Sequence, residues 1–173
     1  LYDVTTTRSG RETAMTGYVR ATVAGGDGDR IAAMAADVCG HADAGATALR
    51  EAKYAWAGQL RASGDRDRAL KLYKELASDV KTREGSEAAY YVIEALFESG
   101  DLDKTESEVF AFSDREPNAY WLAKAFLLLG DVYVRKGDTF QARATYQSVA
   151  DGYSPADDGI VDEAKERIAK LKN

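Results

Sequence analysis

The sequence has few of the residues that metal centres and nucleophilic active sites need. It holds one cysteine, Cys39, and one histidine, His41, among 173 residues. A single cysteine excludes an internal disulfide. A histidine without Cys or His companions is a poor metal ligand, and a His-based triad would rest on that residue alone. We therefore expect no metal, no cofactor and no enzymatic activity, and we expect Cys39 to be a small buried residue.

The sequence also has little proline, no long apolar run and no excess of basic residues. Two prolines leave long helices unobstructed. No apolar run approaches the roughly 20 residues that span a bilayer, so we expect no direct membrane insertion in this segment. The net charge of −6 argues against nucleic acid, because basic patches supply most of that affinity. The chain begins at Leu1 without a signal peptide, and we expect it to be a piece of a longer protein.

What the sequence does contain is a repeated Gly-Asp pair. It occurs at Gly64-Asp65, Gly100-Asp101 and Gly137-Asp138, so that 36 and then 37 residues separate successive glycines. A fixed period of roughly 20–50 residues is typical of solenoids. A left-handed glycine can end one helix, and an aspartate can cap the next. Each pair therefore predicts a tight turn between two antiparallel helices.

Apolar residues recur at helical spacing on both sides of each pair. Before the first Gly-Asp pair the stripe is Ala52, Ala55, Trp56 and Leu60, and after it Ala69, Leu70, Tyr73 and Leu76. The second unit has Ala89, Val92, Ile93 and Leu96, then Leu102, Val109, Phe110 and Phe112. The third has Ala125, Phe126, Leu129, Gly130 and Tyr133, then Phe140, Ala142, Tyr146 and Val149. We expect Tyr73, Tyr133 and Tyr146 in the core, and Gly130 facing Ala142 where two helices approach.

The two ends of the chain extend this pattern. Residues 1–46 are predicted to form a degenerate hairpin, with a capping box from Ser9 to Glu12 and a turn at Gly25–Gly28. Residues 155–173 are predicted to form a capping helix with one apolar stripe, which includes Val161 and Ala164. A second capping box, from Ser113 to Glu116, with Pro117 at the first helical position, is predicted to start the third unit.

These residues resemble the tetratricopeptide repeat (TPR), whose unit is about 34 residues long. The match is close in residues 47–84 and 117–154 and looser in 85–116, where Ile93 and Thr105 replace small residues. The resemblance implies an all-α fold in one continuous domain. That fold would be a right-handed superhelix of about four hairpins plus the capping helix. The C-terminal segment is similar to the ends of bacterial cell-envelope TPR proteins, which favours a periplasmic or outer-membrane-associated location.

In TPR arrays the first helix of each hairpin lines the concave face, and this implies where a partner would bind. The residues predicted for that face are Tyr54, Arg61, Glu87, Tyr90, Glu94, Phe97, Asp131 and Arg135. Position alone leaves Tyr54, Tyr90 and Phe97 divided between core and surface. The Lys and Asn residues of the carboxylate clamp found in chaperone-binding TPRs are absent from the matching positions.

The expected function is a non-catalytic scaffold that binds a protein or peptide as part of a larger protein. The alternative is a purely structural or self-associating segment of a longer solenoid, for instance a homodimer. The numerous acidic and basic residues alternate along the helices and are typical of a solvated surface rather than of a catalytic site.

Overall fold

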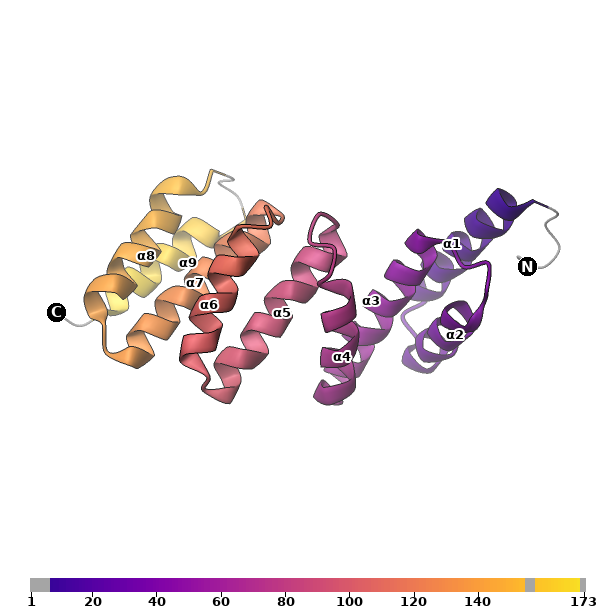
Figure 1. Cartoon of the computed structure of the whole chain (residues 1–173), viewed down its shortest axis with the longest axis horizontal. Coiled ribbons are helices and arrows are strands. Elements are labelled where there is room, and N and C mark those ends of the chain that lie inside the picture. The colour runs from indigo at the N-terminus through magenta and orange to yellow at the C-terminus, as the bar shows by residue number, and fades with distance from the viewer. Residues whose placement is uncertain (1–6, 155–157, 172–173) are drawn as a thin grey trace. The chain divides into compact units, whose positions relative to one another are not determined.

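The computed structural model describes residues 7–154 and 158–171, and within these ranges the chain is all-helical, as predicted (Figure 1). The first four helices are α1 (Arg8–Ala24), α2 (Gly28–Gly40), α3 (Ala46–Ala62) and α4 (Arg66–Leu76). The remaining five are α5 (Arg83–Ser99), α6 (Leu102–Ser113), α7 (Ala119–Lys136), α8 (Thr139–Gly152) and α9 (Ile160–Lys170). Residues 155–157, the first part of the predicted capping segment, lie outside the described residues.

The Gly-Asp pairs form the predicted turns. Gly64, Gly100 and Gly137 have φ angles of +86°, +85° and +79°, a left-handed conformation that L side chains adopt only with strain. The carboxylates of the following aspartates accept hydrogen bonds from the backbone N–H three residues on, at 3.3 Å for Asp65, 3.3 Å for Asp101 and 2.9 Å for Asp138. Each pair thus ends one helix and caps the next within two residues.

The two predicted capping boxes are wrong. Helix α1 is capped by Thr7, whose hydroxyl accepts from Gly10 N–H, while Ser9 already lies inside the helix. Helix α7 is capped by Asn118, whose side chain accepts from Tyr120 N–H. In both places another polar side chain close in sequence makes the capping hydrogen bond.

The chain divides into two compact units, Leu1–Leu76 and Ala77–Asn173, which we call the N-terminal unit and the C-terminal unit. In the N-terminal unit α3 contacts α1, α2 and α4. Its core consists of Met15, Val19, Ile31, Met34, Ala35, Val38, Ala48 and Ala52. The turn at Gly25–Gly28 is present, and the Asp27 side chain caps α2.

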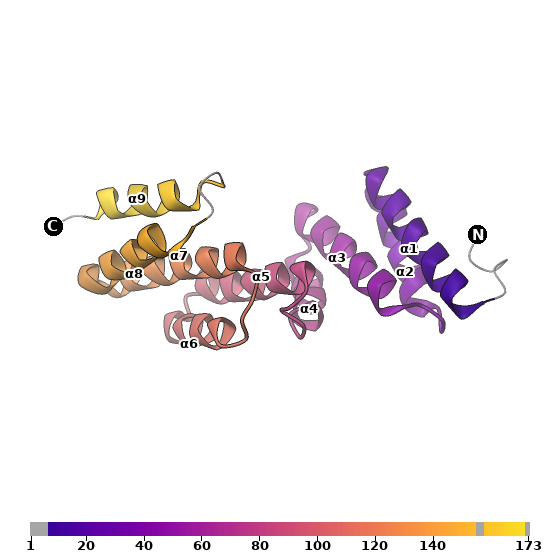
Figure 2. The ribbon, with the colours of Figure 1, turned by 90° about the horizontal axis from the view of Figure 1, so that it is seen from above.

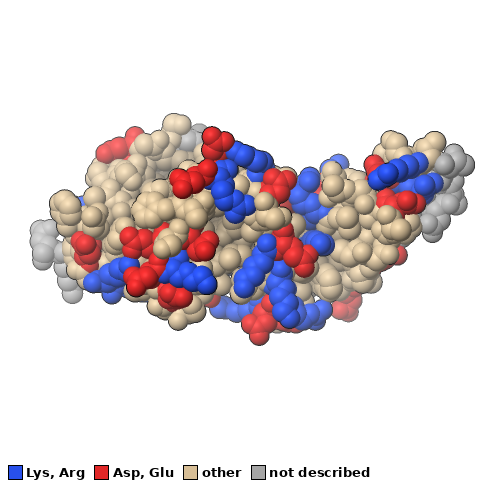
Figure 3. Space-filling view, viewed as in Figure 1, with Lys and Arg blue, Asp and Glu red and all other residues tan. Residues whose placement is uncertain are grey.

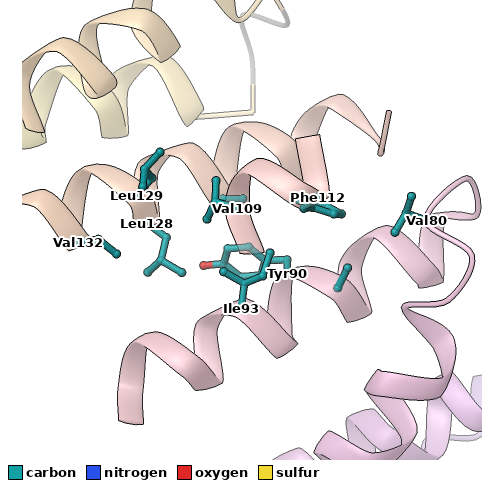
Figure 4. Packing of buried hydrophobic residues seen from close by; sticks show 10 residues of the cluster. Val80, Tyr90, Ile93, Val109, Phe112, Leu128, Leu129 and Val132 are labelled. Atoms are coloured by element: carbon teal, nitrogen blue, oxygen red, sulfur yellow. The ribbon is translucent and has the colours of Figure 1, made fainter. Parts of the chain in front are cut away.

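In the C-terminal unit each helix packs on the next. Helix α7 is central, because it contacts α5, α6, α8 and α9 (Figure 2). In addition, α5 contacts α6, and α9 packs on α8. One core cluster lies between α5, α6 and α7, where Tyr90 and Ile93 meet Val109 and Leu128 (Figure 4). The second lies between α7, α8 and α9 and includes Leu127, Ala142, Tyr146, Val149, Ile160 and Ala164.

Some aromatic and aliphatic residues lie elsewhere than predicted. Tyr73 and Tyr146 are buried, but Tyr133 is half-buried, with its hydroxyl bonded to Glu106. Phe140 and Phe110 are 80% and 46% exposed. Phe140 precedes the buried Ala142 by two residues, which places it about 200° around the helix from the core. In α9 the buried residues are Ile160 and Ala164, whereas Val161, predicted for the stripe, is half-buried.

The connector before α5 is folded onto the C-terminal unit. The fully buried Ser86 hydroxyl donates to Val80 O at 2.5 Å and accepts from Asn118 N–H at 2.9 Å. Arg115 donates to the carbonyls of Ala77 and Ser78 at 2.5 and 3.0 Å. One hydroxyl therefore fixes the connector, α5 and the start of α7 together.

The close approach of α7 and α8 occurs at Gly130, but the facing residue is Tyr146 rather than Ala142. A Cβ atom on Gly130 would lie 2.1 Å from Tyr146 Cε1 and 2.5 Å from its Cδ1. The Tyr146 ring is 1% exposed, and its hydroxyl is bonded to Asp131 at 2.6 Å, so the ring has little room to move. Only a residue without a side chain fits here.

We expect Gly130→Ala to lower the free energy of unfolding by about 1–3 kcal/mol, because the added methyl group overpacks the Tyr146 ring. The control is Gly152→Ala in the same unit, where a Cβ would meet nothing within 4 Å. That variant should stay within about 0.5 kcal/mol of wild type. Denaturant unfolding monitored by circular dichroism measures both, and equal midpoints would contradict the assigned packing.

Candidate functional site

The single cysteine and the single histidine of the sequence do not form a reactive or metal-binding site with other described residues. Cys39 is exposed, contrary to the prediction that it is buried. His41 follows the last turn of α2, and its Nδ1 accepts from Asp43 N–H at 3.2 Å. Among residues 7–154 and 158–171, no group of three or more His, Cys, Asp or Glu side chains is placed to hold a metal ion. None of the helices within these ranges has both the length and the apolar composition that a membrane span requires.

The candidate site consists of side chains on α5, α7 and α9 of the C-terminal unit that contact one another from helix to helix, and we call it the first-helix face. Its centre is a cluster of four aromatic rings. The centroid of Trp121 lies 5.3 Å from that of Tyr90, 5.9 Å from that of Tyr91 and 5.0 Å from that of Tyr120. Tyr90 is 7% exposed and belongs to the core, while the other three rings are half-buried. The cluster is therefore anchored in the core through Tyr90, and its other three rings are partly exposed.

Carboxylates on α5 accept hydrogen bonds from two of these phenols. Tyr91 Oη donates to Glu87 Oε1 at 3.1 Å, and Tyr90 Oη donates to Glu94 Oε1 at 3.3 Å. Desolvation, with the nearby negative charge and hydrogen bond of Glu94, raises the pKa of Tyr90 well above its ordinary value. The phenol therefore stays protonated and acts as a donor at any physiological pH.

A charged network joins α7 to α9 beside the aromatic cluster. Lys124 Nζ lies 3.2 Å from Glu163 Oε2, and Arg167 contacts both Glu163 Oε1 at 2.5 Å and Asp131 Oδ1 at 3.2 Å. Tyr146 Oη completes the network with its hydrogen bond to Asp131 at 2.6 Å. Two cations and two carboxylates balance, and their side chains are between 23% and 33% exposed.

The network lowers the pKa of the Glu163 carboxyl group. Desolvation alone would raise the pKa of Glu163, but hydrogen bonds from Arg167 and Lys124 lower it overall below its ordinary value of 4.5. The folded protein therefore favours the ionised form of Glu163, which ties the last helix to α7.

Further along the same face, α5 and α7 are joined by a guanidinium placed on an aromatic ring. Arg135 Cζ lies 3.6 Å from the centroid of Phe97, and its Nη1 donates to Phe97 O at 2.9 Å. Phe97 is half-buried and packs against the core, while Arg135 is exposed. This is a cation–π contact with an additional hydrogen bond.

The structure brings six of the predicted site residues into the C-terminal unit: Glu87, Tyr90, Glu94, Phe97, Asp131 and Arg135. Tyr54, which is half-buried, and the exposed Arg61 belong to α3 of the N-terminal unit. That unit has its own open groove of about 580 Å³ between α1 and the start of α3, lined by Glu12, Thr13, Thr16, Arg20 and Thr47 among others. Neither Tyr54 nor Arg61 lines this groove.

Sequence reasoning did not assign Tyr91, Tyr120, Trp121, Glu163 and Arg167 to the site. Tyr91 lies next to Tyr90, which the repeat pattern selects, whereas Tyr120 and Trp121 lie in the first turn of α7, where the repeat pattern selects no residue. Glu163 and Arg167 lie on α9, which was predicted only as a cap. Their i, i+4 spacing favours the ion pair that they form within α9, but it does not indicate the contact of Arg167 with Asp131.

Comparison with protein-family models and with curated proteins finds no match for this chain. The resemblance to tetratricopeptide repeats therefore rests on the residues and spacings of the chain itself.

We expect Glu163→Gln to lower the free energy of unfolding by about 1–2 kcal/mol at pH 7, because two charge-assisted hydrogen bonds are weakened. A lowered native pKa stabilises the fold above the ordinary value of 4.5, and that contribution is lost as the pH falls below it. The difference from wild type should therefore shrink in acid. Thermal unfolding of both proteins between pH 7 and about pH 3.5 tests this.

The control is Glu166→Gln on the same helix. Glu166 is 71% exposed and pairs with Lys170 at 3.6 Å, so its loss should change stability by no more than about 0.5 kcal/mol. A difference between Glu163→Gln and wild type that is constant with pH would contradict the role assigned to this carboxylate.

Proposed function

We propose that the chain is a non-catalytic scaffold of the tetratricopeptide-repeat type, which binds a protein or peptide segment on the faces of its first helices. The observation that carries the proposal is the first-helix face of the C-terminal unit, with its anchored aromatic rings and fixed charges. Rigid aromatic anchors surrounded by oriented charges are the features that protein-binding surfaces use for affinity and direction.

The arrangement of helix pairs supports the solenoid part of the proposal. Within the C-terminal unit, first helices α5, α7 and α9 follow one another, and second helices α6 and α8 pack between or beside them. A helix pair in such an array cannot bury its apolar stripe alone and must stack on a neighbour. The first helices then share one surface, which a partner can cover without disturbing the core.

The charge distribution supports a protein partner over nucleic acid. Lys and Arg side chains are interspersed with Asp and Glu on the face that Figure 3 presents, with no extended basic patch there. The similarity of the last segment to cell-envelope TPR proteins favours an envelope protein as the partner.

Peptides selected from a random display library against the immobilised chain should bind the first-helix face. We expect Tyr91→Ala to weaken a selected peptide by at least about tenfold, because removal of a central aromatic anchor typically costs more than 1 kcal/mol. Fluorescence anisotropy with labelled peptides measures this, after circular dichroism has shown that the variant is folded.

The matched control is Phe140→Ala, which removes an 80% exposed aromatic ring from α8, on the second helix of its pair. Affinity for the same peptides should stay within about twofold of wild type. Equal losses in both variants would refute the assignment to the first-helix face. Failure to select any peptide, together with self-association in sedimentation velocity, would favour a structural segment instead.

A further inference from the structure

We propose that a second surface of the C-terminal unit binds a helical segment of a partner protein, which carries one large apolar side chain with lysine or arginine one turn before and one turn after it. The surface lies where α6 packs on α7, and it consists of Phe110, Phe126, Glu106 and Asp114; we call it the α6–α7 surface. It shares no residue with the first-helix face, so this inference goes beyond the proposed function.

The apolar part of this surface is a pair of phenylalanine rings. Phe110 on α6 is 46% exposed, and its ring centroid lies 6.3 Å from that of Phe126 on α7, with the two ring planes at 87°. Phe126 is half-buried and packs against both core clusters of the unit. The edge-to-face contact therefore holds the exposed ring in place from one side. A ring that is already held in place loses little conformational entropy when a partner covers it.

The position of α6 in the unit leaves the Phe110 ring accessible. Within the part of the chain that the structure describes, α6 contacts α5 and α7, and it does not contact α8 or α9. Figure 2 shows α6 and α9 on opposite sides of α7, so the network that joins Asp131 to Arg167 lies away from α6. The side of α6 that bears Phe110 is therefore not covered by a neighbouring helix of this unit.

Carboxylates flank the ring pair along α6. Glu106 and Asp114 lie four residues before and after Phe110, so all three share one side of the helix. Glu106 accepts hydrogen bonds from the Tyr133 phenol at 2.8 Å and from Lys136 Nζ at 2.6 Å. By contrast, no Lys or Arg among the described residues forms an ion pair with Asp114. Of the two carboxylates, Asp114 is therefore the one that lacks a cation.

Asp114 also lies where its charge is unfavourable for the fold. It is the C-cap residue of α6, and the last turn of this helix contains no basic residue. The C-terminal end of a helix carries a partial negative charge, so a carboxylate there is repelled. A cation from a partner would relieve this repulsion, whereas removal of the charge from the unbound protein should not destabilise it.

The charge of α6 favours a basic partner. Residues 101–114, which are α6 with its two caps, hold five Asp and Glu and one Lys, a net charge of −4. Residues 77–173 hold 12 Lys and Arg against 19 Asp and Glu, a net charge of −7. More than half of the excess negative charge of the unit thus lies in this segment, and Figure 3 shows Asp and Glu side chains gathered over α6. Such a surface attracts a cationic segment and repels nucleic acid and anionic lipid.

The spacing of these groups defines the partner. Four residues of helix, about 6 Å along the axis, separate each carboxylate from Phe110. A second helix that lies along α6 has the same rise per residue. Lysine or arginine at i−4 and i+4 therefore reaches Glu106 and Asp114 while the apolar residue at i meets the two rings. The apolar contact supplies most of the affinity, and the charge pairs at its rim fix the register.

The test uses the full chain and three labelled, capped peptides of about sixteen residues, long enough to form a helix in an alanine–glutamine background. The first peptide carries a central leucine with lysine four residues before and after it. The second has glutamate in place of both lysines, and the third has alanine in place of the leucine. Fluorescence anisotropy measures binding. We expect the first peptide to bind at least about tenfold tighter than either of the others.

A pair of ring variants tests the apolar part of the surface. Phe110→Ala should weaken the first peptide by at least about tenfold, because it removes the ring that the leucine contacts. The matched control is Phe140→Ala, which removes an 80% exposed ring from α8 and should change the affinity by less than about twofold. Circular dichroism first shows that both variants are folded. Equal losses would overturn the proposal, because they would reveal non-specific apolar adhesion.

A pair of isosteric variants tests the carboxylate. Asp114→Asn and Glu108→Gln each remove one negative charge from the same segment, but Glu108 lies beside Ala89 and Val92 of α5, away from Phe110. Asp114→Asn should weaken the first peptide about three- to fivefold, and Glu108→Gln by less than about 1.5-fold. Equal losses would overturn the proposal, since net charge alone would explain them. A lower melting temperature of Asp114→Asn would also overturn it, because the carboxylate would then have a structural role.

The remaining outcomes separate this surface from the first-helix face. Tyr91→Ala, which tests the first-helix face, should leave the affinity of the first peptide unchanged, so that either surface can fail without the other. Loss of binding in that variant, equal binding of the lysine and glutamate peptides, or no binding at all would overturn the proposal. Self-association in sedimentation velocity that Phe110→Ala abolishes would overturn it too, because a second copy of the chain would then occupy the surface.

Discussion

The fold depends on the conformation of the Gly-Asp pair, which is repeated three times along the chain. A glycine in the left-handed conformation ends one helix, and the next residue, an aspartate, caps the following one. Because no further residues intervene, the second helix must run back along the first. At Gly100-Asp101 and Gly137-Asp138 this places α6 against α5 and α8 against α7. Helices α5 and α7, each of which precedes one of these turns, also pack on each other.

Several residues of the candidate site contact both the core and the surface, so the site combines buried and exposed groups. Tyr90 is packed among aliphatic residues, yet its ring contacts Trp121, which reaches the surface. Asp131 bonds to the buried Tyr146 and also to Arg167 on α9. Rings and charges on this face are therefore held by the interior, which would reduce the conformational entropy lost on binding of the proposed partner.

Helical periodicity and the Gly-Asp pairs were sufficient to predict the helices and the tight turns between them, because both signals are local in sequence. The caps of α1 and α7 were not predicted, since Thr7 and Asn118 compete with polar neighbours and only backbone geometry decides between them. Phe140 is apolar, but its angle around α8 turns it away from the buried Ala142 and Tyr146, so the prediction that it belongs to the apolar stripe is wrong. The link between Asp131 and Arg167 joins residues 36 positions apart, so no local pattern contains it.

The separation of the cores has a consequence for the way the chain is made. Each core is closed within its own stretch of sequence, and the break falls between Leu76 and Ala77. A ribosome adds about 5–20 residues per second and releases the N-terminal part first. The four helices of the N-terminal unit can therefore bury Met15, Met34 and their neighbours while the acidic second half is still being synthesised. The nascent chain then exposes one set of apolar residues at a time, which limits its aggregation during translation.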